Sequence, residues 1–136
     1  MYETFEHTAD LGLRIVAPDL DTLFAEAAQG LTAMIVANLD QVRLVREVTF
    51  RVPGAKCDEL LFDWLNEILY AFEGEHLLLA GFDVHIGDTG LVATAQGEPL
   101  DLQRHQLEHE VKAITYHGLK VERCDGGWLA EVIVDI

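Results

Sequence analysis

The sequence predicts a single α+β domain in which an antiparallel-rich β-sheet carries two main helices on one face. Three observations support this prediction. The chain has 136 residues, a length typical of one domain. Half of its residues are apolar, which is enough for a hydrophobic core. Two segments have helical apolar spacing, whereas about seven or eight have the alternation or β-branched composition of strands.

The first third of the chain predicts two strands followed by a helix. Residues 1–7 and 11–17 have the pattern of short strands joined by a turn that contains Asp10. A proline and an aspartate then interrupt the alternation. Asp21 is a suitable N-cap for a helix over residues 21–37, where apolar side chains recur every three or four positions.

The middle of the chain predicts one strand, one helix and one hairpin. Residues 41–52 are rich in β-branched side chains and suit a strand or a bent hairpin. Residues 58–73 have the clearest helical spacing, with a broad apolar stripe. Strand patterns over 77–86 and 91–96 flank a glycine-rich turn and predict a hairpin. Within the single domain 1–136, residues 56–100 are a candidate sub-lobe.

The last third of the chain predicts a β-meander. A strand over 111–117 is expected to end at a turn at Gly118, and a second strand follows over 119–123. A glycine-rich turn then leads into a final strand over 128–136.

The formal net charge of −15 excludes several classes of function. Nucleic-acid modules and membrane-surface proteins bind phosphate through Lys and Arg, so neither direct nucleic-acid binding nor membrane binding is expected. The interval between Lys56 and Arg104 contains ten carboxylates and no Lys or Arg. Three of them, Glu59, Asp63 and Glu67, follow one another along a single face of the predicted helix. A solvated acidic surface is the default interpretation, and a surface for a basic partner is the alternative.

Other features favour a cytoplasmic protein that is not an enzyme. The two cysteines, Cys57 and Cys124, are isolated and fit a reducing compartment. The chain shows no signal peptide, no apolar run of membrane-spanning length and no nucleophile elbow or phosphate-binding glycine loop. His105 to His109 match the H-x-x-E-H zinc motif, but that motif requires a helix and the residues that follow have a strand pattern.

The end of the chain offers a candidate cation site. Asp135 is one residue from Ile136 and its terminal carboxylate, and a carboxylate from another turn would complete a small oxygen cluster. Ca²⁺, Mg²⁺ and Mn²⁺ all prefer oxygen ligands. A loosely ordered terminus with a solvated Asp135 is the competing interpretation, and His7 and Asp10 have ordinary structural roles available to them.

Several segments of the sequence resemble the archease family. They occur in the order and spacing of that family and run from one end of the chain to the other: Glu6–Gly12, Phe62–Glu67, Gly97–Pro99 with Arg104–His105, Glu110–Leu119, and Gly127–Ile136.

The resemblance implies a protein cofactor of the RNA-splicing ligase RtcB, which uses GTP and Mn²⁺ to join RNA ends in tRNA splicing and RNA repair. The cofactor is expected to promote guanylation of the ligase and multiple turnover. The resemblance also implies metal ligands at Asp10, Asp135 and Ile136, with Ca²⁺ favoured over Mg²⁺ or Mn²⁺. Candidate partner-facing residues are His7, Asp63, Glu67, His105 and His117.

Two other functions stay open at this point. One is a carboxylate–metal phosphoester hydrolase, in which Asp10 and Asp135 hold the metal and His105 acts as a base. The other is a chaperone-like module that modulates a tRNA methyltransferase, in which the acidic surface matters and the metal does not.

Overall fold

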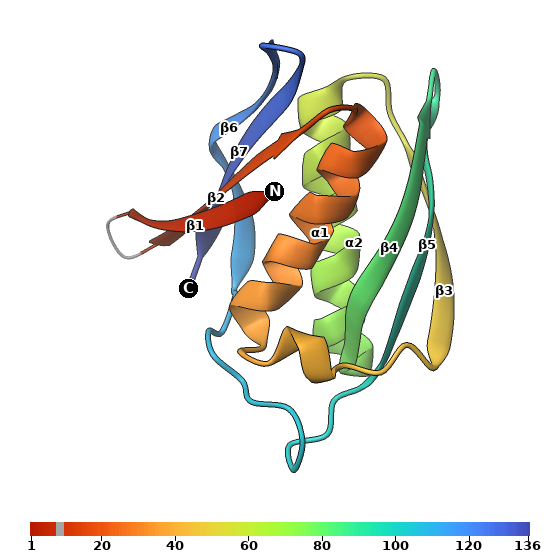
Figure 1. Ribbon diagram of the computed structural model, residues 1–136, viewed down its shortest axis with the longest axis vertical. Coiled ribbons are helices and arrows are strands. Elements are labelled where there is room, and N and C mark those ends of the chain that lie inside the picture. Colours follow the sequence, from red (N-terminus) through yellow and green to blue (C-terminus); the bar gives the residue numbers. More distant parts are fainter. Residues whose placement is uncertain (8–9) are drawn as a thin grey trace.

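A computed structural model of the protein describes residues 1–7 and 10–136, with the side chains of Glu6 and His7 outside the described part. Over these residues the chain forms seven strands, two α-helices and one short 3-10 helix (Figure 1). The elements are β1 (Tyr2–His7), β2 (Asp10–Ala17), α1 (Leu20–Ile35), η1 (Leu39–Gln41), β3 (Arg46–Pro53), α2 (Cys57–Glu75), β4 (Leu77–Gly87), β5 (Gly90–Pro99), β6 (Ala113–Cys124) and β7 (Gly127–Asp135).

The strands form two antiparallel sheets with the helices between them (Figure 1). The larger sheet has the order β1-β2-β7-β6, and the smaller has the order β3-β5-β4. The predicted α+β class and its antiparallel strands are confirmed. The structure divides the expected sheet into two, so that α1 and α2 each bury side chains between layers.

The N-cap of helix α1 lies two residues before the predicted one. Asp19 is the N-cap, and its carboxylate accepts a hydrogen bond from the Thr22 backbone N–H at 2.7 Å. The carboxylate of Asp21 instead accepts from the Ile86 backbone N–H at 2.9 Å and so ties α1 to β4. The hydrogen bond from Thr22 lowers the pKa of Asp19, as expected for a capping carboxylate.

Helix α2 joins the helical layer to the smaller sheet through Trp64. This side chain is fully buried, and its indole N–H donates to the Phe24 carbonyl oxygen of α1 at 3.0 Å. The rings of Phe50 and Phe82, from β3 and β4, meet the indole edge-on. The predicted helix over 58–73 is therefore confirmed, with one residue more at its start and two more at its end.

Two predicted strand boundaries are wrong. Residues 113–124 form one strand, and the turn expected at Gly118 is a bulge in which residues 116–119 lie opposite the single residue Val132. Gly118 has a φ of +71°, which accommodates the extra residues without strain. The strand expected over 41–52 is β3, which begins only at Arg46 because η1 and an irregular segment precede it.

The buried side chains form one hydrophobic core between the two sheets. It contains Leu13 and Ile15 of β2, Val132 and Val134 of β7, and the inward faces of both helices. Neither described helix combines the length and the apolar character needed to cross a bilayer.

Candidate functional site

The register of the larger sheet places Asp10 directly opposite Asp135. Asp10 is the first residue of β2 and Asp135 the last of β7, and the two are partners in the antiparallel ladder. Partners in such a ladder have Cα atoms about 4.5–5.5 Å apart and side chains on the same face of the sheet. Asp10 is half-buried, Asp135 is exposed, and Ile136 is half-buried beside them. We call these three residues the acidic tip.

The acidic tip rests on a well-anchored strand end. β7 is a central strand, paired with β2 on one side and β6 on the other as far as Asp135. The Lys112 backbone N–H donates to the Asp135 carbonyl oxygen at 2.7 Å. The preceding Val134 and Val132 are fully buried. Core packing and pairing on both sides therefore hold this end of the strand in place, in contrast to a loosely ordered terminus.

The donors at the acidic tip fit part of a cation shell. Asp10 and Asp135 supply carboxylate oxygens, and Ile136 supplies a main-chain oxygen, which are ligands that hard cations prefer. Within residues 1–7 and 10–136, no three His, Cys, Asp or Glu side chains that the structure describes gather as a metal cluster. Since Ca²⁺ takes about six to eight oxygen ligands, water or a partner would have to supply the remainder.

Behind the acidic tip, the same face of the sheet carries its own counter-charges. Arg14 donates from Nε to Glu131 at 2.7 Å and from a terminal nitrogen to Glu3 at 3.1 Å. Lys120 Nζ lies 3.3 Å from the same Glu131. The hydrogen bond from Arg14 lowers the pKa of Glu131 against the opposing effect of burial. The Phe5 ring lies under Arg14 and fills the space over Gly12, where a Cβ would lie 2.1 Å from the ring.

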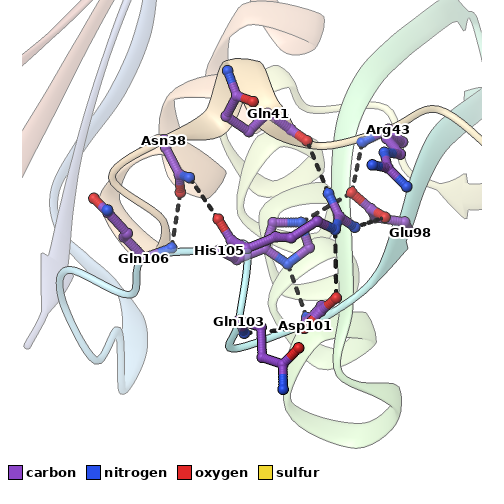
Figure 2. Close-up of polar contacts among 9 residues, drawn as sticks. Asn38, Gln41, Arg43, Glu98, Asp101, Gln103, His105 and Gln106 are labelled. Carbon is purple, nitrogen blue, oxygen red and sulfur yellow. Dashed lines mark hydrogen bonds and ion pairs between the residues drawn. The ribbon is translucent and has the colours of Figure 1, made fainter.

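A second cluster of charged groups is centred on the buried Glu98, near the end of β5 (Figure 2). Glu98 is 5% exposed and accepts hydrogen bonds from the Arg43 backbone N–H at 2.7 Å and from the Arg104 guanidinium. Its Oε2 also lies 2.9 Å from His105 Nε2. Burial alone would raise the pKa of Glu98, but these donors outweigh it and lower the pKa to about 2. We call these four residues, with Asp101, the Glu98 network.

The protonation of His105 follows from its two ring contacts. Its Nδ1 accepts a hydrogen bond from the Asp101 backbone N–H at 2.9 Å, so this nitrogen carries no proton. The proton lies on Nε2 and is donated to Glu98. The residue is 3% exposed, so in this structure the His105 ring presents no open surface to a partner. Both ring nitrogens have partners inside the protein, and His105 therefore has a structural role.

The H-x-x-E-H segment forms no helix, as its sequence context predicts. Instead it completes the end of α1. The backbone N–H groups of Glu108 and His109 donate to the carbonyl oxygens of Ile35 and Met34, at 2.9 and 3.0 Å. These carbonyls belong to the last turn of α1, which otherwise lacks intrahelical donors. The segment is a helix cap, and the two ring nitrogens of His105 are engaged inside the protein rather than open to a metal.

The remaining candidate residues lie on the surface. Asp63 and Glu67 are exposed on α2, and His117 is exposed in the bulge of β6. The side chain of His7 lies outside the described residues, although its backbone is the ladder partner of Asp10.

Sequence reasoning missed the central part played by Glu98. It stood as one of ten carboxylates in the acidic interval and as part of the Gly97–Pro99 segment that resembles the archease family, but no role was assigned to it. The available signal was its position: Glu98 precedes a proline and lies six and seven residues before an Arg-His pair, a compact set of charged groups that pair with one another.

The whole chain matches a known protein family. The model of the Archease protein family (MTH1598/TM1083) matches residues 2–136. The protein archease of Methanopyrus kandleri is 42% identical over 139 residues, which cover 99% of each chain. The protein archease of Pyrococcus furiosus is 38% identical over 140 residues, which cover 99% of this chain and 98% of that protein.

Two solved structures share the fold. The solution structure of Methanobacterium thermoautotrophicum protein 1598 superposes with a TM-score of 0.88 at 31% identity, covering 99% of this chain and 98% of that one. The crystal structure of a Thermotoga maritima archease, described as a possible chaperone, has a TM-score of 0.67 at 22% identity, with coverage of 100% and 98%. The second likeness, at this identity, concerns the fold alone.

Proposed function

Because the chain belongs to the archease family, we propose that it is a non-catalytic protein cofactor of an RtcB-type RNA ligase. In this role it promotes guanylation of the ligase and multiple-turnover ligation in tRNA splicing and RNA repair. The acidic tip is the part that acts, and the protein works in the cytoplasm, where Cys57 and Cys124 remain thiols.

The observation that carries the proposal is the register of Asp10 against Asp135. Two like charges directly opposite each other on neighbouring strands destabilise a sheet by roughly 0.2–1 kcal/mol. The sequence places this pair at the end of the sheet, where Asp135 is exposed and the strand behind it is anchored by buried valines. Two carboxylates held side by side at an exposed sheet end are suited to receive a cation.

A divalent cation at the acidic tip would be held by the two carboxylates and an Ile136 oxygen. Ca²⁺ is the first candidate, and Mg²⁺ or Mn²⁺ would use the same donors. When bound, such an ion supplies a positive charge with coordination positions left for the partner. The chain's own part is to place Asp10 and Asp135 side by side on a fixed sheet end.

The charge of the chain supports a protein partner over RNA. A net charge of −15 repels the phosphate backbone and favours encounter with a basic surface. An RNA ligase needs a basic cleft for its substrate, so an acidic cofactor and a phosphate-handling enzyme are complementary. Binding of the acidic tip near that cleft would stabilise the conformation that accepts the guanylyl group.

The test is a guanylation and ligation assay with a purified RtcB-type ligase. The Asp10→Ala and Asp135→Ala variants should lose most of the stimulation of guanylation and of multiple turnover. Asp83→Ala, which removes an exposed carboxylate from β4, is the matched control and should stimulate like the unaltered protein. Full stimulation by both tip variants, with unchanged folds by circular dichroism, would contradict the proposal.

A further inference from the structure

The exposed side of α2 carries a regular row of carboxylates. Glu59, Asp63 and Glu67 are all exposed and follow one another at intervals of one turn. Tyr70 continues the row and is 59% exposed. Like charges at this spacing destabilise a helix slightly, so the row lowers the stability of the isolated protein.

An aromatic side chain from the larger sheet joins this row. Tyr116, in the bulge of β6, stacks on Phe62 of α2 with ring centroids 4.4 Å apart and planes 37° apart. Phe62 is half-buried, whereas Tyr116 is 51% exposed. The stack fixes the orientation of the tyrosine ring and leaves about half of its surface open to a partner.

The electrostatic environment of this ring is negative. Partial desolvation raises the pKa of Tyr116, and the charges of Glu59, Asp58 and Asp63 raise it further. A phenol whose ionisation is opposed by three carboxylates lies in a field that attracts cations. Its ring face, which is itself negative, adds to this attraction.

The other flank of α2 is hollowed against β3. One hollow of about 250 Å³ is lined by Arg51 and Pro53 of β3 and by Phe62, Asp63, Glu67 and Tyr70 among others of α2. A second, of about 210 Å³, has Val48 and Phe50 of β3 opposite Glu67 and Tyr70. Among the described residues that line the two hollows, Arg51 is the only basic one.

We propose that this surface, formed by Glu59, Phe62, Asp63, Glu67, Tyr70 and Tyr116 and called the α2 face, docks an arginine-bearing segment of a protein partner. Guanidinium groups would stack on the open side of Tyr116 and pair with the carboxylates of α2, while apolar side chains of the segment enter the hollows beside β3. We take that partner to be the ligase, and in this respect alone the inference rests on the proposed function.

Arginine fits this surface better than lysine for two physical reasons. The planar guanidinium stacks on an aromatic face and pairs with a carboxylate through two parallel hydrogen bonds, whereas an ammonium group is a compact, strongly hydrated charge. Tyrosine is also among the residues that dominate binding energy at protein interfaces. Two of the three tyrosines of the chain, Tyr70 and Tyr116, lie on the α2 face.

The direct test measures binding of labelled octa-arginine and octa-lysine peptides to the purified protein by fluorescence anisotropy at low ionic strength. Octa-arginine should bind more tightly than octa-lysine. The double variant Asp63→Asn/Glu67→Gln and the single variant Tyr116→Leu should each raise the Kd for octa-arginine by about fivefold or more. The double variant Asp83→Asn/Asp88→Asn makes the same change in net charge on the exposed β4–β5 hairpin and should raise it less than twofold.

Three results would overturn the inference: equal weakening by the two double variants, no change with Tyr116→Leu, or equal affinity for the two peptides. Equal weakening by the two double variants would mean that overall charge drives peptide binding. Either of the other two results would mean that the Tyr116 ring does not contribute to binding.

A second measurement separates this inference from the proposed function. With the ligase, variants of the α2 face should raise the cofactor concentration needed for half-maximal stimulation and leave the maximum unchanged. Variants of the acidic tip should lower the maximum, whatever their additional effect on the half-maximal concentration. Unchanged half-maximal concentrations would contradict the docking surface while the proposed function stands. Failure of the unaltered protein to bind or stimulate the ligase would contradict the proposed function, and the peptide result would then decide the α2 face alone.

Discussion

The acidic tip and the Glu98 network use carboxylates in opposite ways. Glu98 is buried and accepts hydrogen bonds from Arg43, Arg104 and His105. Figure 2 shows Arg43 and His105 on two sides of its carboxylate. At the acidic tip two carboxylates lie opposite each other at the end of a sheet. Among the described residues, no hydrogen bond or ion pair reaches the side chain of Asp135, which is exposed to solvent. A carboxylate with internal donors stabilises the fold, whereas one held at a surface against a like charge is placed for an external cation.

The largest effect is expected from removing the charge of the buried Glu98. Glu98→Gln should lower the free energy of unfolding by roughly 3 kcal/mol at neutral pH, since it removes the charge that accepts from Arg104 and His105. Urea denaturation measures the change. Glu47→Gln, at an exposed position on β3, should change stability by less than about 0.5 kcal/mol. A loss as small as this with Glu98→Gln would show that the network contributes little.

The pH dependence of stability also tests the contribution of Glu98. The folded pKa of Glu98, about 2, lies below its ordinary value of 4.5, so the unfolded chain binds the extra proton between these values. The stabilisation is therefore fully present above about pH 5 and is lost as the pH falls towards 2. Urea denaturation of the unaltered protein at pH 7, 5 and 3 should follow this course. Glu98→Gln should reduce the drop, with Asp19 and Glu131, whose pKa values are also lowered, contributing to what remains. An unchanged drop in the variant would assign it entirely to other carboxylates.

Cation binding tests the exposed side of the comparison. Added Ca²⁺ should stabilise the protein by about 2.7 kcal/mol when its concentration is 100 times its Kd, because it binds the folded acidic tip. Asp135→Asn should abolish most of this gain. Thermal unfolding with and without Ca²⁺, repeated with Mg²⁺ and Mn²⁺, measures the effect and ranks the metals. Equal stabilisation of the variant would place the cation elsewhere.

The smallest expected effect is a gain in stability, opposite in sign to the effect of Glu98→Gln. Without a divalent cation, Asp135→Asn should stabilise the protein by roughly 0.2–1 kcal/mol, since it relieves the repulsion with Asp10 across the ladder. Urea denaturation in the presence of a chelator measures this change. Destabilisation by Asp135→Asn would mean that the carboxylate has a structural role like that of Glu98, and the distinction between the two regions would fail.

The parts of the fold that local sequence determines were predictable. The alternation of Leu13, Ile15 and Ala17 identifies β2, and the apolar spacing around Trp64 identifies α2. The separation into two sheets was not predictable, because strand pairing joins residues as distant as Asp10 and Asp135. The bulge at Gly118 was mistaken for a turn, since a glycine with positive φ serves both purposes and only the partner strand decides between them.

The same distinction between local sequence and long-range contacts applies to the candidate site. The pairing of Asp10 with the end of the chain followed from family resemblance, and the register of β2 against β7 supplies its geometry. The exposure of Asp63 and Glu67 followed from their place opposite the apolar stripe of α2. The burial of His105 did not follow, because the loop after β5 has no apolar pattern that indicates burial, and the contacts of the ring with Glu98 and with the Asp101 backbone form only in the folded loop.

The most direct test of the central claim is the affinity of the protein for an RtcB-type ligase with and without a divalent cation. Isothermal titration with Ca²⁺ present and with chelator present would be repeated for Asp135→Asn. We expect Ca²⁺ to tighten binding of the unaltered protein about tenfold or more, and to have little effect on the variant. Equal affinity with Ca²⁺ and with chelator, or the same gain for Asp135→Asn, would contradict the role of the acidic tip.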